Sequence, residues 1–131
     1  MDVLSSRLLL RPTDWDRSQA FYRDVLGLAV HREFGPPDHP GVVFFLGSGL
    51  LEVSGRSARP PAGMRLWLQV RDAAAEHDRL AAAGVPVLRE PRLEPWGLVE
   101  AWVTDPDGVE IALVEVPADH PLRRDPRRPG T

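Results

Sequence analysis

The sequence contains no cysteine, no lysine and no asparagine among its 131 residues. The absence of cysteine excludes disulfide bonds, thiolate catalysis, zinc fingers and iron–sulfur clusters together. No apolar run approaches the ~20 residues that a membrane-spanning helix needs. The N-terminus also lacks the basic, apolar and small-residue series of a signal peptide, so we expect a cytoplasmic protein without a membrane partner.

A strong charge of one sign is also lacking, because 16 basic residues nearly balance 19 acidic residues and leave a formal net charge of −3. A chain without a basic field is not expected to bind nucleic acid. Hydrophobic residues make up 43% of the chain and charged residues 27%, as in an ordinary globular protein. The length predicts one domain, residues 1–131, that is large enough to bury a core.

The chain contains a duplicated pattern that covers most of its length. Residues of matching type recur roughly 58 positions apart. The matched pairs are Arg7 with Arg65, Asp14 with Asp72, Gly27 with Gly84, Phe45 with Trp102, and the positions of Glu52 and Ala112. Two copies are too few for a solenoid but suit two half-domains packed about a pseudo-twofold axis. We expect module one at about 4–54, a linker at 55–63, module two at about 64–116 and a mobile tail at 117–131.

Both copies have the same predicted order of elements, βαβββ. An apolar run of strand length comes first, and an aspartate suited to cap a helix follows it. A helical pattern then ends at a glycine, where a left-handed cap is favoured, and three strands follow. In the first copy these elements are Leu8–Arg11, Asp14, Trp15–Leu26, Gly27, Leu28–Phe34, Val42–Leu46 and Leu50–Ser54; in the second they are Leu66–Arg71, Asp72, Ala73–Ala83, Gly84, Pro86–Arg89, Leu98–Thr104 and Val109–Val116.

Several short motifs occur in an order that is typical of one superfamily. They are Phe21-Tyr22 with Leu26-Gly27-Leu28, the turn Ala83-Gly84-Val85, Pro95-Trp96-Gly97, and Asp105-Pro106-Asp107-Gly108 followed by the strand Glu110–Glu115. With the paired modules, they resemble the vicinal oxygen chelate superfamily of glyoxalase I, extradiol dioxygenases, and fosfomycin and bleomycin resistance proteins. The resemblance covers about residues 4–116. It implies an α+β fold in which two βαβββ modules form a cupped mixed β-sheet with helices on the outer face, and a homodimer.

The same resemblance identifies the positions at which enzymes of this superfamily hold a divalent metal, usually through His, Gln or Glu. Here those positions are Arg7, Glu52, Arg65 and Ala112. Arginine is a permanent cation without a free lone pair and alanine has no donor atom, so only Glu52 could ligate. A catalytic centre needs about three protein ligands, and the histidines share no short ligand spacing. We therefore predict no metal and no other cofactor.

Strand alternation places a set of polar and aromatic side chains on the inner face of the predicted cup. The set consists of Arg7, Phe45, Glu52, Arg65, Trp67, Gln69 and Trp102; Glu100 and Glu110 fall on the same face, and Trp96 is expected at the rim. Aromatic walls with a few convergent polar groups are typical of ligand pockets. The trio Arg7, Glu52 and Arg65 could instead form an ion-pair network that fills the space of a lost metal, and the sequence leaves both interpretations open.

The pattern favours a metal-free protein that binds a small molecule in the cup, for antibiotic resistance or sequestration. Tryptophans with two arginines suit an aromatic ligand that is anionic or electron-rich better than a cation such as bleomycin. The alternative is a metal-independent lyase, isomerase or other small-molecule enzyme, with Glu52 as catalytic base or orienting group between Arg7 and Arg65. Two nearby cations should lower the pKa of Glu52 and weaken it as a base. A dimeric scaffold without a ligand is the third hypothesis.

Overall fold

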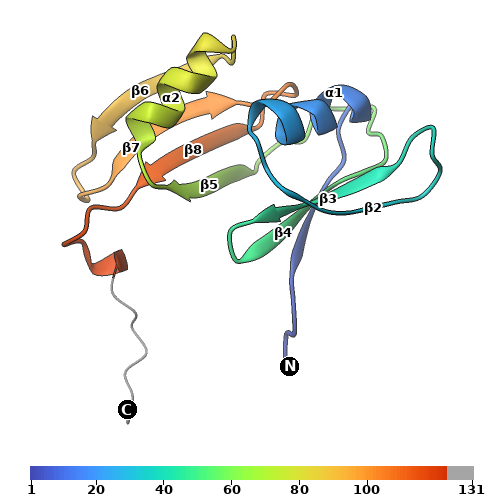
Figure 1. Cartoon of the computed structure of the whole chain (residues 1–131), viewed down its shortest axis with the longest axis horizontal. Helices are drawn as coiled ribbons and strands as arrows, with labels where there is room; N and C mark the ends of the chain where they lie inside the picture. The colour runs from blue at the N-terminus through green and yellow to red at the C-terminus, as the bar shows by residue number, and fades with distance from the viewer. Residues whose placement is uncertain (124–131) are drawn as a thin grey trace.

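The chain folds into two four-stranded sheets, one from each module, in a computed structural model that describes residues 1–123 (Figure 1). In each sheet the first and last strands of the module pair in parallel, and the remaining neighbours are antiparallel. The first sheet has the order β1-β4-β3-β2, with β1 at Arg7–Leu10, β2 at Val30–Phe34, β3 at Gly41–Leu46 and β4 at Gly49–Val53. The second has the order β5-β8-β7-β6, with β5 at Arg65–Val70, β6 at Val87–Leu93, β7 at Val99–Thr104 and β8 at Glu110–Glu115. The predicted α+β fold of two βαβββ modules is confirmed, and each module forms its own four-stranded sheet.

The helices begin where the sequence predicts. Asp14 caps α1 (Trp15–Ala20) and Asp72 caps α2 (Ala73–Ala82), each carboxylate accepting a backbone N–H of the first turn. The first predicted helix is nevertheless divided, because α1 passes into the π-helical stretch η1 (Phe21–Val25). A π-helical turn widens the backbone and shifts the side chains that follow it.

Strand β6 is longer than the sequence predicted, since it continues through Pro91 to Leu93. A proline fits here because β6 lies at the edge of its sheet, where one side of the strand needs no ladder partner. The pairing register with β7 shifts between Arg89 and Arg92. The extension brings both arginines into the sheet that carries the candidate site.

The hydrophobic core lies between the helices and one face of each sheet. Its largest fully buried side chains include Tyr22, Phe44, Leu51, Leu80 and Ile111. The other face of each sheet is turned away from the helices, and we call it the open face. The open face of the first sheet carries Arg7, Leu9, Phe45, Leu50 and Glu52, and that of the second carries Arg65, Trp67, Gln69, Glu100, Trp102, Glu110 and Ala112.

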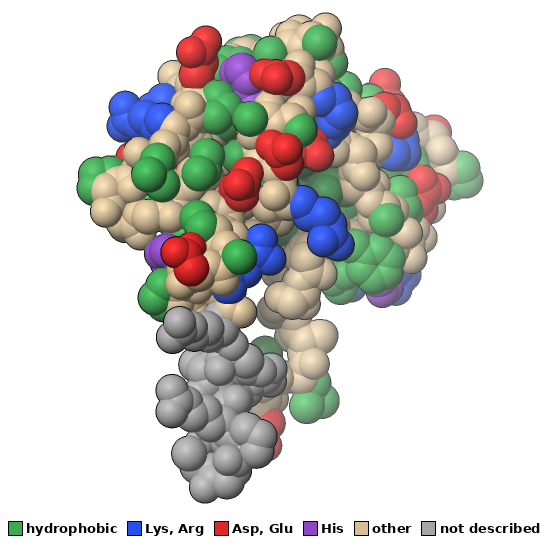
Figure 2. Space-filling model, turned by 60° about the vertical axis from the view of Figure 1, so that its left-hand side comes forward, with side chains coloured by type: hydrophobic (Ala, Val, Ile, Leu, Met, Phe, Trp, Pro, Cys, Tyr) green, Lys and Arg blue, Asp and Glu red, His purple; other side chains and the backbone are tan. Residues whose placement is uncertain are grey.

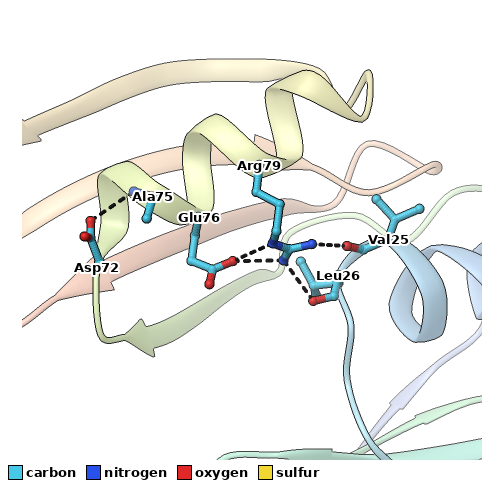
Figure 3. Close-up of polar contacts among 6 residues, drawn as sticks. All are labelled: Val25, Leu26, Asp72, Ala75, Glu76 and Arg79. Carbon is cyan, nitrogen blue, oxygen red and sulfur yellow. Dashed lines mark hydrogen bonds and ion pairs between the residues drawn. The ribbon is translucent and has the colours of Figure 1, made fainter.

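An arginine of the second module fastens the end of the first helix. Arg79 of α2 donates to the carbonyl oxygens of Val25 at 2.7 Å and Leu26 at 3.2 Å (Figure 3). Glu76, one turn earlier on α2, accepts two hydrogen bonds from the same guanidinium. A cation placed at free carbonyls satisfies the end of a helix, so this contact joins the two modules.

The turn between β7 and β8 makes a second junction. The buried Tyr22 hydroxyl donates to Asp105 at 2.8 Å, and Asp107 accepts from the Thr13 backbone N–H at 2.9 Å and from the Thr13 hydroxyl. Asp105 also accepts two backbone N–H groups of its own turn. Burial raises the pKa of Asp105 and, together with that carboxyl group, the pKa of Tyr22. Both aspartates are thus used in shaping the turn and in joining the modules.

The first part of the predicted tail contacts the second module. His120 donates to the carbonyl oxygen of Trp96 at 3.0 Å, and Arg123, in the short helix η2 (Pro121–Arg123), donates to that of Val116 at 2.7 Å. Residues 124–131, with the remaining arginines of the tail, lie outside the described residues.

Figure 2 shows arginine and acidic side chains interleaved over one face of the molecule. Within residues 1–123, no helix has the length and apolar character needed to cross a membrane.

Candidate ligand-binding site

The open face of the first sheet carries an ion pair between two predicted site residues. Arg7 Nη1 donates to Glu52 Oε1 at 2.9 Å across the parallel strands β1 and β4, and Ser54 Oγ donates to Glu52 Oε2 at 2.6 Å. Both carboxylate oxygens therefore accept a hydrogen bond. The Ser54 hydrogen bond, with a smaller contribution from Arg7, holds the pKa of Glu52 below its usual range. An ionised carboxylate with both oxygens engaged is a weak general base.

We expect Glu52→Gln to lower the stability at pH 7 by about 1.5–3 kcal/mol, the scale of a hydrogen bond to a charged group. A pKa that is lower in the folded state gives stability that is present above the unfolded value, ~4.3, and lost as the pH falls through the folded value. The wild type should therefore lose more stability than the variant between about pH 5 and pH 3. Urea denaturation across this range measures the difference.

Glu33→Gln is the matched control, because Glu33 is exposed on β2 of the same sheet. This variant should keep the pH dependence of the wild type. If Glu52→Gln also kept it, the hydrogen-bonded Glu52 carboxylate would not be the source of the acid sensitivity.

Arg65 does not join the cluster of Arg7 and Glu52. Its Nε pairs with Glu110 Oε2 at 2.6 Å, and its guanidinium carbon lies 5.3 Å from the centre of the Trp102 ring. The expectation that Glu52 lies between Arg7 and Arg65 is therefore wrong for Arg65. The physical reason is register: Glu110 lies directly opposite Arg65 in the β5–β8 pair, on the same face of the sheet.

A cavity of about 370 Å³ opens on the face of the second sheet that carries Arg65. Its volume lies in the range of small-molecule sites, roughly 300–1,000 Å³. The residues that line it are Arg65, Leu88, Arg89, Trp96, Glu100, Trp102 and Glu110. Three of them, Arg65, Trp96 and Trp102, were predicted as ligand-binding residues from the sequence. Glu100 and Glu110 were placed on this face by strand alternation but were not named as ligand-binding residues, and Leu88 and Arg89 were missed.

Glu100 connects the two tryptophans of the cavity. Its side chain is buried, and its Oε2 accepts the Trp96 Nε1–H at 2.7 Å while its Oε1 accepts the Trp102 Nε1–H at 3.3 Å. Arg89 Nη2 lies 3.8 Å from the same Oε1. One carboxylate thus sets the orientation of two indole rings.

A second buried carboxylate supports the arginines of β6. Glu94 pairs with Arg89 at 2.5 Å and with Arg92 at 3.0 Å, and the Arg89 guanidinium carbon lies 6.0 Å from the centre of the Trp102 ring. Arg89 Nε is buried without a hydrogen-bond partner among the described residues. This network depends on β6 continuing through Pro91. The acidic and basic residues on either side of the proline were the only sign of the network in the sequence.

Three predicted site residues lie on the open faces but outside this cavity. Phe45 and Trp67 are half exposed, Gln69 is exposed, and the Phe45 ring meets the His31 ring edge-on with centres 5.0 Å apart. Arg7 and Glu52 likewise lie outside the cavity, on the first sheet. The structure therefore divides the predicted set between a polar cluster on one sheet and an aromatic cavity on the other.

A larger groove, of about 680 Å³, lies on the helix side between η1 and the turn between β7 and β8. Its buried carboxylate, Asp105, is already engaged by Tyr22 and by the turn. The open-face cavity is the better candidate site, because it combines aromatic walls with convergent charged groups.

The donor set at the superfamily's metal positions does not fit a divalent cation. Glu52 is engaged by Arg7 and Ser54, Arg65 pairs with Glu110, and Ala112 has no donor atom. Among residues 1–123 no group of three or more His, Asp or Glu side chains is placed to hold a metal ion.

Comparison with known proteins identifies the family. A model of the Glyoxalase/Bleomycin resistance protein/Dioxygenase superfamily matches residues 5–113, and the chain belongs to this superfamily. The chain is 31% identical over 119 residues to the lactoylglutathione lyase of Haemophilus influenzae, covering 82% of this chain and 88% of the relative. It is 29% identical over 119 residues to a probable lactoylglutathione lyase of Synechocystis sp., covering 82% and 91%. The resemblance inferred from the sequence motifs is confirmed.

Solved structures show the same fold. TnmS3, an antibiotic binding protein from Streptomyces sp. CB03234, matches with a TM-score of 0.73 and 23% identity, covering 88% of this chain and 98% of that one. A superfamily member from Sphaerobacter thermophilus matches with a TM-score of 0.72 and 23% identity, covering 87% and 98%. At this level of identity the similarity concerns the fold.

Proposed function

We propose that this protein binds a small aromatic molecule in the open-face cavity of the second sheet and does so without a metal. The observation that carries the proposal is the cavity itself, in which Trp96 and Trp102 are fixed by Glu100 beside Arg65 and Arg89. Aromatic walls and fixed charges can hold a ligand without a side chain that reacts with it. Binding of this kind suits sequestration or antibiotic resistance. The antibiotic binding protein TnmS3 shares the fold and supports this direction.

Metal independence is part of the proposal. A dication at the superfamily's metal positions would meet the guanidiniums of Arg7 and Arg65 and one carboxylate that is already engaged. Like charges at such short range are unfavourable. The aromatic cavity uses side chains that are separate from these positions, except for Arg65.

A metal-independent enzyme is the second candidate, because relatives at about 30% identity are named lactoylglutathione lyase. Its base would be Glu52, the one carboxylate at the superfamily's metal positions. The lowered pKa of Glu52 and its two hydrogen bonds disfavour proton abstraction. Binding without turnover is therefore the function that the geometry supports best.

The proposal is tested by thermal denaturation against a panel of aromatic acids, phenols and antibiotics, with and without EDTA. We expect at least one aromatic compound to raise the Tm by the same amount with and without EDTA, because the proposed site uses no metal. A ligand at 100 times its Kd adds about 2.7 kcal/mol to the free energy of unfolding. Elemental analysis should show no stoichiometric zinc, nickel, manganese or iron. The proposal fails if stabilisation by every aromatic compound is abolished by EDTA, or if none stabilises the protein.

We also propose a homodimer, on the basis of the exposed open faces and of the superfamily resemblance. Leu9, Phe45 and Trp67 expose apolar surface there, and β1 and β5 are sheet edges. Sedimentation at micromolar concentration should give twice the chain mass of 14.5 kDa, and Leu9→Glu should shift the protein to monomer. A wild type that sediments as a monomer would overturn the proposal.

A further inference from the structure

We propose that Trp96 and Trp102, held by Glu100, form an indole clamp for one flat aromatic ring system that carries an acidic oxygen. In this clamp Glu100 is the positioning residue, and Arg65 selects the acidic group. The inference rests on the proposed function and assigns the chemical class of its ligand.

The hydrogen bonds of Glu100 occupy the N–H groups of both indoles, so a ligand can meet the rings only by their faces, beside the guanidiniums of Arg65 and Arg89 that lie over Trp102. Both Nε1–H groups are donated to the same carboxylate, at 2.7 Å from Trp96 and 3.3 Å from Trp102. Trp96 is 55% exposed whereas Glu100 is 4% exposed, so the ring at the rim is oriented by a buried anchor more than by packing. Ring faces bind other flat aromatic systems by offset stacking.

The backbone of the clamp is fixed as well. His120 donates to the Trp96 carbonyl oxygen at 3.0 Å, and the Gly97 N–H donates to the Glu94 carbonyl oxygen at 2.9 Å. Backbone and side chain of Trp96 are thus both held before a ligand arrives. A wall that is already ordered loses less conformational entropy on binding.

Arg65 is the cation that can change its partner at little cost. Its ion pair with Glu110 joins side chains that are 68% and 38% exposed, and exposed pairs contribute only about 0–1 kcal/mol. Arg89, in contrast, is held by the buried Glu94. A carboxylate, phenolate or sulfonate on the ligand can therefore replace Glu110 as the partner of Arg65, while Glu110 turns to water.

The experiment uses two fluorescent probes with the same aromatic rings. One is 8-anilinonaphthalene-1-sulfonate, and the other is N-phenyl-1-naphthylamine, which lacks the sulfonate. For each variant the affinity for both probes, the Tm and the tryptophan emission spectrum are measured. Proflavine serves as a flat cationic probe.

We expect Glu100→Gln and Trp96→Ala each to weaken both probes by about tenfold or more, because the first variant loses the charged hydrogen-bond acceptor that orients the rings and the second loses a ring face for stacking. Glu100→Gln should also shift the tryptophan emission to longer wavelength. Glu115→Gln is the matched control, because Glu115 lies on β8 of the same sheet, outside the cavity, and accepts a backbone N–H of α2 but no indole N–H; its affinities should change by less than about threefold, even where its Tm falls. Trp96→Ala keeps the test valid if Glu100→Gln fails to fold, since that ring is exposed.

Arg65→Met should weaken the sulfonate probe by about tenfold and leave the neutral probe within about twofold. Glu110→Gln frees Arg65, so it should bind the sulfonate probe as well as or better than the wild type. Arg92→Met is the control arginine, because Arg92 does not line the cavity.

Each negative result has a separate meaning. Probes that bind equally to the wild type, Glu100→Gln and Trp96→Ala overturn the clamp and leave the proposed function standing. Equal loss of both probes in Arg65→Met, or preference of the wild type for proflavine, overturns the acidic ligand class. Failure of the wild type to bind either probe or any member of the aromatic panel overturns the proposed function together with this inference.

Discussion

Replacement of Asp105 by Ala is expected to destabilise the protein by about 3–5 kcal/mol, because several buried groups would lose their partner at once. Asp105 is 4% exposed, and its carboxylate accepts the hydroxyl of Tyr22, which is completely buried. It also accepts two backbone N–H groups at 2.9 Å and 2.8 Å. An unsatisfied buried donor costs about 1–3 kcal/mol, so the losses at the hydroxyl and the turn together give the expected size.

Urea denaturation of a double-mutant cycle with Tyr22→Phe separates the two parts of this effect. The double variant has no buried hydroxyl left to lose its partner. Its loss of stability should therefore be smaller than the summed losses of the two single variants by about 1 kcal/mol or more. Strict additivity would show that the hydroxyl and the carboxylate do not interact. Asp105→Asn should be milder than Asp105→Ala, because the amide oxygen can still accept from the turn.

The second large effect is expected from Trp102→Ala, which should remove detectable aromatic binding and cost about 2–4 kcal/mol of stability, somewhat less than for a fully buried tryptophan. The ring packs against a small cluster of buried residues on the open face, Leu98, Ala112, Val114 and Val116. It also lies within cation–π distance of Arg65 and Arg89 and donates to Glu100. The substitution removes a wall of the cavity and the surface on which both guanidiniums rest.

Trp102→Phe is the control for this experiment, since phenylalanine keeps a ring face but loses the N–H donor. Its affinity for the best aromatic ligand and its Tm should both lie between those of the wild type and Trp102→Ala. Isothermal titration and thermal denaturation on the same samples give the two quantities. Full affinity in Trp102→Ala would place the ligand elsewhere on the molecule.

Much of the fold could be predicted because its signals are local. Asp14 and Asp72 cap the helices as expected, and Gly27 and Gly84 adopt the positive φ angles, 82° and 86°, that a left-handed helix cap requires. The continuation of β6 through Pro91 was missed, because a proline disfavours a strand unless that strand lies at a sheet edge, and edge position is a property of the whole fold.

The site could be predicted only in part, because strand alternation gives the face of a side chain but not its partner. Glu100 and Glu110 were placed on the correct face by alternation, yet the pairing of Arg65 with Glu110 depends on the register of β5 against β8. The bond from Trp96 to Glu100 depends on the turn between β6 and β7. Each of these contacts is set by neighbouring strands and turns, which a pattern within one strand does not specify.

The two turns that close the final hairpins of the modules differ in how much added sequence they should tolerate. Gly47 and Ser48 are exposed at the tip of the β3–β4 hairpin. At the corresponding place in module two, Asp105 and Asp107 reach across to the other half of the chain. An inserted peptide should leave the rest of the fold intact at the first turn. At the second it would disturb the hydrogen bonds that join the two modules, so of these two matching turns only the first should accept new sequence.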